Sequence, residues 1–178
     1  MKFLFVVIAS FFSYTPSYSQ VANDTIYWSP CYKLKWDDFK AKPDTLSKFG
    51  AVSNPIIKYH LVSTQKKFTI NVICVFIKSK SWSIFKNSDT LLMHEQGHFD
   101  IAELFARKLR KCFSEYKFNP VTVAKDIDQL FMINKQERAK MDSLYDKSTN
   151  LSRNGKQQMV WNELIKIELN KLKNFASP

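Results

Sequence analysis

Residues 91–110 of the chain, LLMHEQGHFDIAELFARKLR, decide the fold. Apolar side chains recur in this stretch every three or four residues, which is the period of an amphipathic helix. One stripe of such a helix contains Leu91, His94, His98, Ile101, Phe105 and Leu109, and other faces carry Asp100, Glu103, Arg107 and Lys111. The pattern predicts a helix that begins at about Asp89, with this residue as its N-cap, and ends at about Lys111.

Two histidines lie on this apolar stripe at the spacing of the motif HExxH. His94 and His98 are four residues apart, so both rings lie on one face of the helix and can bind one ion. Glu95 lies beside that face, where a carboxylate can take a proton from water activated by the ion. Buried histidines need polar partners, and a hydrogen-bonded pair in the core is the alternative to a metal. The motif favours Zn²⁺ bound by His94 and His98, with Glu95 as the catalytic base.

A zinc site of this kind needs a third protein ligand. Glu103 is nine residues after His94 and points about 180° away from it, so we exclude Glu103. The second predicted helix offers Glu137 and Asp146 as acidic candidates, and Tyr145 as a hydrogen-bond donor to a transition-state oxyanion. The sequence leaves the choice between Glu137 and Asp146 open.

The chain before the motif is rich in β-branched and aromatic residues, which favour strands. Strands are predicted at residues 25–28, 34–39, 56–62 and 67–77. His60 falls on the third of these, where we expect a structural role. Two further helices are predicted from Asn119-Pro120 to Tyr145 and from Gly155 to Asn174. Strands followed by helices predict an α+β fold, in which a small antiparallel sheet from the N-terminal half packs against about three helices, one of them a zincin-like HExxH helix.

Residues 1–19 have the layout of a secretory signal peptide. Lys2 supplies a positive charge, residues 3–12 (FLFVVIASFF) form a short apolar core, and Ser17-Tyr18-Ser19 places small residues at a possible cleavage site. The apolar run is about half of the ~20 residues that a membrane span needs, and we expect no stable span elsewhere. We therefore expect an exported protein, periplasmic or secreted, with one zincin-like metallopeptidase domain at residues 20–178.

The formal net charge is +11, from 27 basic and 16 acidic residues. The lysines are scattered and match no nucleic-acid-binding motif, so we expect a solvated basic surface and no nucleic-acid partner. Attraction to an anionic envelope surface is an alternative that this charge leaves open. Cys31, Cys74 and Cys112 form no CxxC pair, which gives a cysteine zinc site no support, and three thiols cannot all pair within one chain.

With these residues the chain resembles the bacterial domain-of-unknown-function family 922, which is described as predicted secreted zinc-dependent proteases. The resemblance spans most of the chain after residue 19, and its most specific block is HEQGHFDIAE at residues 94–103. Further matching positions are residues 34–39 (LKWDDF), residues 80–82 (KSW), Glu137, Met141, Tyr145-Asp146, Thr149, Gln158 and Trp161. The resemblance implies His94 and His98 as zinc ligands and Glu95 as acid/base in the hydrolysis of a peptide or protein substrate.

One segment departs from the family pattern. Near the end of the second helix the family has YD, any residue, E, T, any residue, H, where this chain has YDKSTNL at residues 145–151. Ser148 and Leu151 thus replace a glutamate and a histidine, and leucine cannot coordinate a metal. If that histidine is a ligand in the family, this chain uses Asp146 or Glu137 instead, binds metal weakly, or has lost catalysis. The alternative function is a catalytically degenerate relative that binds a metal or a partner without hydrolysis.

Overall fold

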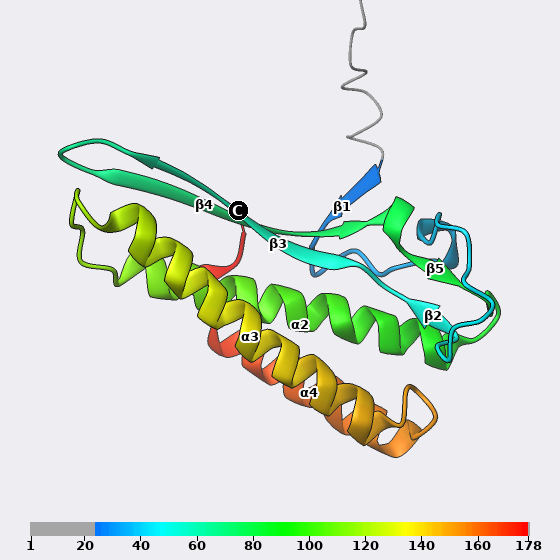
Figure 1. Cartoon of the computed structure of the whole chain (residues 1–178). Helices are drawn as coiled ribbons and strands as arrows, with labels where there is room; N and C mark the ends of the chain where they lie inside the picture. The colour runs from blue at the N-terminus through cyan, green and yellow to red at the C-terminus, as the bar shows by residue number, and fades with distance from the viewer. Residues whose placement is uncertain (1–23, 178) are drawn as a thin grey trace, which may run out of the picture.

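The computed structural model describes residues 24–177, so the predicted signal peptide at residues 1–19 lies outside the described residues. The chain forms β1 (Thr25–Tyr27), β2 (Ala51–Val52), β3 (Pro55–Ser63), β4 (Phe68–Ile77), β5 (Trp82–Ser83), α2 (Asp89–Ser114), α3 (Val123–Thr149) and α4 (Gly155–Lys171), with single 3-10 turns at Trp36–Asp38, Lys78–Lys80 and Lys173–Phe175. Figure 1 shows the strands above the helices. The predicted α+β class, with a small antiparallel sheet and three α-helices in the described residues, is confirmed.

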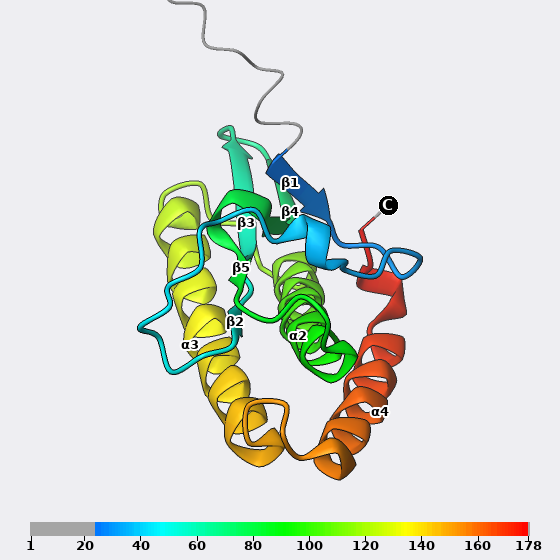
Figure 2. The same ribbon diagram turned by 90° about the vertical axis from the view of Figure 1, so that its right-hand side faces the viewer.

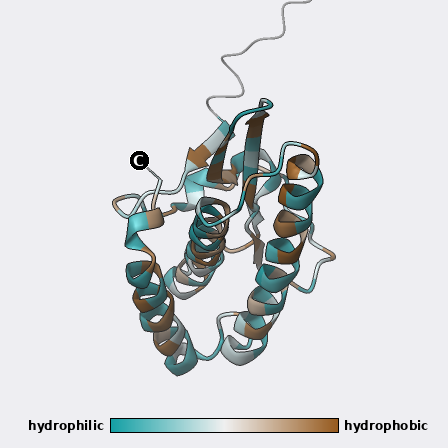
Figure 3. Ribbon diagram, turned by 90° about the vertical axis from the view of Figure 1, so that its left-hand side faces the viewer, coloured by the Kyte–Doolittle hydropathy of each residue, from teal (hydrophilic) through white to brown (hydrophobic). Residues whose placement is uncertain are grey.

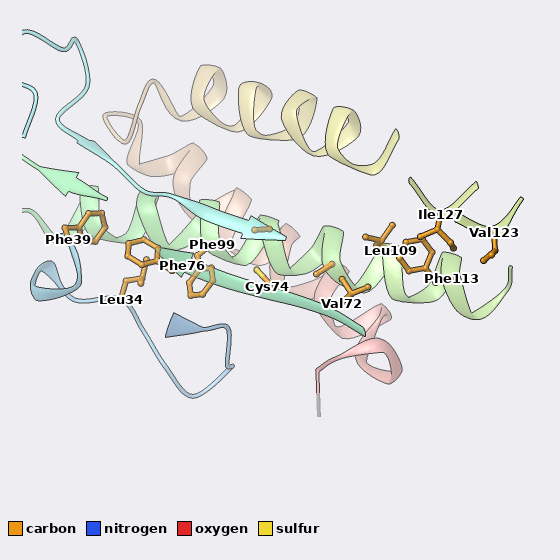
Figure 4. Close-up of a cluster of buried hydrophobic side chains, with 12 residues drawn as sticks. Leu34, Phe39, Val72, Cys74, Phe76, Phe99, Leu109, Phe113, Val123 and Ile127 are labelled. Carbon is orange, nitrogen blue, oxygen red and sulfur yellow. The ribbon is translucent and has the colours of Figure 1, made fainter. Parts of the chain in front are cut away.

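The main sheet has three antiparallel strands in the order β1-β4-β3, and β2 pairs with β5 in a separate ribbon of two short strands. β3 and β4 are paired along their whole length, which makes them one long hairpin. Because side chains alternate across a strand, every second residue at the end of β4 faces the helices. Figure 4 shows this core, which includes Leu34, Phe39, Val72, Cys74, Phe76, Phe99, Leu109, Phe113, Val123 and Ile127.

Helix α2 lies at the centre of the molecule, between the sheet and the pair formed by α3 and α4 (Figures 1 and 2). It therefore buries more than the predicted apolar stripe: Glu103 and Arg107, on other faces of the helix, are also buried. The two outer helices differ from it. Teal and brown residues alternate along α3 and α4 in Figure 3, as expected for helices with one buried and one exposed face.

Three predicted boundaries of the helices are corrected by their capping residues. The N-cap of α2 is Ser88, whose hydroxyl accepts from the Leu91 N–H at 3.3 Å, so Asp89 is the first helical residue. Helix α3 begins at Val123, because the Asn119 side chain accepts from the N–H of Val121 and holds the preceding residues in a turn. It also ends four residues later than predicted, at Thr149.

The strand predicted at residues 34–39 is wrong. The segment forms a loop and a 3-10 turn, because the buried carboxylate of Asp38 accepts from the Lys35 N–H at 2.9 Å and from the Tyr32 hydroxyl at 2.7 Å. A side chain that bonds its own backbone three residues earlier closes a turn in place of a strand. Burial and the hydrogen bond to Asp38 raise the pKa of Tyr32 to about 12.

Two further predictions from the sequence concern the cysteines and membrane-spanning helices. Cys31, Cys74 and Cys112 are all free thiols. Burial raises the pKa of Cys74 well above its ordinary value, which keeps this thiol protonated in the core. Between residues 24 and 177, no helix has the length and apolar character needed to cross a bilayer.

Candidate metal centre

Two helices bring three ligand atoms together. His94 and His98 project from α2 toward α3, where Asp146 occupies the last turn. Oδ1 of Asp146 lies 3.1 Å from Nε2 of His94 and 2.9 Å from Nε2 of His98. The ligand atoms of the three residues lie within 4.8 Å of one another, so this group could hold a metal ion.

The other nitrogen of each ring has a partner of its own. Nδ1 of His94 is 3.1 Å from Oε1 of Gln158 on α4, and Nδ1 of His98 is 2.9 Å from Oδ1 of Asp142 on α3. The amide nitrogen of Gln158 donates to the Tyr145 hydroxyl, so its oxygen is the atom that faces His94. Both partners are acceptors, and so is Asp146 at Nε2, so each neutral ring can carry its proton on Nδ1 and keep a lone pair at Nε2, or donate from Nε2 to Asp146.

The form with the proton on Nδ1 is the one that can bind a metal ion. A neutral ring with its proton on Nδ1 presents a lone pair at Nε2. In His94 and His98 these lone pairs point at the same carboxylate oxygen of Asp146, which has lone pairs but no hydrogen when ionised. With both Nε2 atoms unprotonated the three atoms are all acceptors, and a shared proton or a metal ion between them would satisfy them.

The pKa shifts of His98 and Asp146 are consistent with a shared cation. Burial lowers the pKa of His98, but its hydrogen bonds to Asp142 and Asp146 outweigh burial and raise the pKa to about 10. Burial raises the pKa of Asp146, whereas hydrogen bonds from the two histidines hold the pKa of this carboxyl well below its ordinary value. The cluster thus stabilises positive charge, which a divalent cation supplies in place of protons.

A close helix contact fixes the position of His94. Its ring stacks on the buried ring of Tyr145, with centroids 4.6 Å apart and an interplanar angle of 13°. The Tyr145 hydroxyl donates to the His94 carbonyl oxygen at 3.1 Å. A Cβ atom at Gly97 would overlap this hydroxyl, so glycine is required there for α2 and α3 to approach each other.

Glu95 lies in the same cleft as the three ligands. The cleft has a volume of about 710 Å³ and lies between the loop at residues 47–53, α2, α3 and the loop after α3. The Glu95 side chain is buried, and its Oε2 accepts from the Ser53 N–H at 2.9 Å. This bond holds Oε2 in place, and Oε1 does not take part in it.

The structure separates the other candidates from the site. Glu137 lies on the exposed side of α3 and pairs with Lys140 at 2.8 Å, so it is not a ligand. Tyr145 is wrong as an oxyanion donor, because its hydroxyl is buried and bonded to Gln158 and the His94 carbonyl. His60 is exposed on β3.

Ser148 lies in the last turn of α3, and Leu151 lies in the loop that follows it; these are the positions where the family pattern has other residues. The Ser148 hydroxyl accepts from the Trp161 indole of α4, on the side away from the metal ligands. Leu151 lines the cleft next to the ligands. The structure therefore places a leucine, and no metal-binding side chain, where the family resemblance would place a histidine.

Sequence reasoning missed the two outer partners, Asp142 and Gln158. Asp142 and Asp146 are four residues apart on α3, which repeats the spacing of His94 and His98 on α2. This matched pair of spacings was a signal that two helices face each other through four ligand-type side chains. Gln158 gave no such signal, because an isolated glutamine in a helix is usually exposed.

Comparisons of the chain with protein-family models, with curated proteins and with solved structures find no significant match. The resemblance to family 922 therefore stays a prediction from the residues quoted above.

Proposed function

We propose that the protein is an exported zinc-dependent peptidase, with His94, His98 and Asp146 as metal ligands and Glu95 as the general base. The observation that carries the proposal is the convergence of two Nε2 lone pairs and a carboxylate oxygen beside Glu95 in one cleft. The histidine pair on a zincin-like helix and the predicted signal peptide support zinc chemistry outside the cytoplasm.

The donor set fits zinc. Two imidazole nitrogens and one carboxylate oxygen are three of the ligands that catalytic zinc sites use, and they leave a fourth position open. His94 is 3% exposed, while the Asp146 side chain is 34% exposed, so the site opens on the side of the cleft. Asp142 and Gln158 supply the outer hydrogen bonds that orient the two rings. When bound, zinc supplies Lewis acidity that polarises a peptide carbonyl and acidifies water.

Other side chains of the cleft would transfer the proton and orient the ligands. The Ser53 N–H holds one oxygen of Glu95, so the other is positioned to accept the proton of the attacking water and to pass it to the leaving amine. Because the two histidines are held by Asp142, Gln158 and Tyr145, their rings need little rearrangement during the reaction.

The test is zinc content and peptide hydrolysis of the purified protein, compared with Glu95→Gln. This variant keeps all three ligands, so we expect an unchanged zinc content and a kcat lower by about 10²–10⁴-fold, the usual contribution of a general base. Glu137→Gln, on the exposed side of α3, is the matched control and should change neither quantity. A protein without metal, or hydrolysis that is indifferent to Glu95→Gln, would contradict the proposal.

The second candidate is a degenerate relative that binds a metal or a partner without hydrolysis. The position of Leu151 in the cleft favours it, because the family resemblance predicts a histidine there. Leu151→His separates the two functions: activity that appears only in this variant supports degeneration, whereas activity of the unmodified protein rejects it. Zinc bound by an inactive protein would support the metal site and contradict the peptidase function.

A further inference from the structure

The cleft carries two cations that have no acidic partner. Lys48 lies in the loop before β2 and Arg153 in the loop after α3, on two walls of the cleft, and both are exposed. Among the residues that the structure describes, neither has a carboxylate within 4.0 Å, although the ammonium of Lys48 lies 5.2 Å from the ring centroid of Phe49. Their charges are therefore available to a ligand.

Every acidic side chain in the cleft, in contrast, is already engaged. Glu95 accepts from the Ser53 N–H, and Asp146 lies against the two histidines. Asp142 lies against His98 and also 3.2 Å from the guanidinium of Arg138. Each carboxylate of the cleft therefore already has a partner, although Oε1 of Glu95 does not share the Ser53 contact.

The charge balance of the cleft depends on the metal. Its three carboxylates are matched by Lys48, Arg138 and Arg153, so the cleft is neutral when both histidines are neutral. A divalent cation on the ligands gives the loaded cleft a net charge of about +2, on a chain whose own net charge is +11. Such a net positive charge in a cleft raises the local concentration of anions.

The backbone holds Arg153 in place. Asn150, Leu151 and Ser152 have φ angles of 49°, 50° and 75°, which is the left-handed region. Non-glycine residues in this region cost on the order of 1 kcal/mol or more each, so the surrounding contacts must stabilise the loop. They include the bonds from the Leu151 N–H to the Asp146 carbonyl at 2.9 Å and from the Arg153 N–H to the Asn150 carbonyl at 3.1 Å. The cationic wall is thus tied to the last turn of the metal-binding helix.

We propose that the cleft selects peptides with acidic side chains next to the segment that lies on the metal ligands, and that Lys48 and Arg153 determine this specificity. The inference rests on the proposed function for the location of the substrate, but it concerns binding and is independent of turnover. An extended peptide fits because the cleft, at about 710 Å³, is large enough for several side chains and has an apolar wall that includes Ile84 and Phe85.

The test measures binding of fluorescent peptides to the full chain loaded with zinc and carrying Glu95→Gln, so that no peptide is consumed. Two peptides differ at two central positions, which are Glu-Glu in one and Lys-Lys in the other. We expect the acidic peptide to bind about tenfold more tightly at low salt, with a preference that shrinks as salt is added. The double variant Lys48→Glu and Arg153→Glu should reverse the preference.

The matched control is Lys66→Glu with Lys117→Glu, which changes the net charge equally at exposed positions outside the cleft. It should keep the preference of the parent protein. Equal affinity for the two peptides, no measurable binding of the acidic peptide, or a shift in the control as large as in the cleft variant would overturn the inference. A preference that persists although the unmodified protein hydrolyses nothing would overturn the proposed peptidase function and leave this specificity intact.

Discussion

Helix α2 carries two buried polar clusters, and they differ in how their atoms are paired. The first is the group of His94 and His98 with Asp146, in which two ring nitrogens converge on one carboxylate oxygen. The second lies nine residues further along, where the carboxylate of Glu103 accepts from Arg107 at 2.9 Å and from Arg110 at 3.0 Å. In the second cluster donors face acceptors throughout.

The two arginines of the second cluster also donate to backbone carbonyls. Arg107 donates to the Leu169 carbonyl at 2.7 Å, and Arg110 donates to the Phe175 carbonyl at 2.9 Å. These bonds tie α2 to α4 and to the turn that follows it, so the cluster is complete without a ligand. The difference teaches that burial of polar groups does not by itself indicate a functional site. Two ring nitrogens that converge on one carboxylate oxygen are a better indication, because one cation can be shared by all three atoms.

Loss of Asp146 should have the largest effect on zinc affinity, because it removes a proposed ligand of the first cluster. Asp146→Ala takes away the oxygen on which both Nε2 atoms converge. We expect zinc affinity to fall by more than the ~10–100-fold that loss of an outer partner costs, because a direct bond to the metal is lost. Titration with zinc in competition with a chelator measures this. A variant that retained the parent affinity would show that the ion is not bound here.

Breaking the second cluster should reduce stability and leave zinc binding unchanged. Glu103→Ala leaves the buried guanidinium of Arg107 and the half-buried guanidinium of Arg110 without their counter-charge, and breaking a buried ion pair typically costs about 3–5 kcal/mol in the free energy of unfolding. Glu137→Ala, at an exposed ion pair, should cost less than about 1 kcal/mol and serves as the control. Denaturant unfolding measures both. If Glu103→Ala lowered zinc affinity in the folded protein, the separation of the two clusters would be wrong.

A proton and a zinc ion can each occupy the first cluster, and they predict opposite trends with pH. The stability of the metal-free protein falls as the pH rises, whereas its affinity for zinc increases. In chelator-treated protein the hydrogen bonds to Asp142 and Asp146 outweigh burial and raise the pKa of His98 from 6.5 to about 10. The stability that this proton contributes is complete below pH 6.5 and is lost as the pH rises toward 10. Zinc must displace the same proton, so zinc affinity rises over that interval.

Thermal unfolding with zinc and with chelator, across this pH range, measures both trends. His98→Asn should abolish the loss of stability in the chelator-treated protein, and His60→Asn, at an exposed position on β3, should retain it. Parallel pH trends with and without zinc would mean that protons and metal do not compete for this site.

The fold was largely predictable, because local periodicity is encoded in the sequence. The period of residues 91–110 predicted α2 and its histidine face, and the content of β-branched and aromatic residues predicted the strands β3 and β4. The strands β2 and β5 contain two residues each, too few for any period to be visible. The prediction at residues 34–39 failed because one side-chain bond from Asp38 overrode the propensity of its neighbours.

The site was predictable only in part, because the sequence does not specify distances between helices. HExxH fixed His94, Glu95 and His98, since their relation lies within one helix. Asp146 and Glu137 were equivalent candidates until the packing of α3 on α2 was known, and this packing depends on the contact between Gly97 and Tyr145. The burial of Glu103 has the same origin, because it follows from the position of α2 between two layers.

The smallest effect concerns Gln158, which acts on the first cluster through His94 and is therefore a positioning residue. Gln158→Leu removes the acceptor for Nδ1 of His94, so the ring can place its proton on Nε2 and present no lone pair to zinc. We expect zinc affinity to fall by about 10–100-fold. Gln158→Glu retains an acceptor and should recover most of the affinity, which a purely steric role for Gln158 would not predict. The exposed neighbour Gln157→Leu is the control, and an equal loss in that variant would show that α4 acts through general stability and leaves the protonation of His94 unchanged.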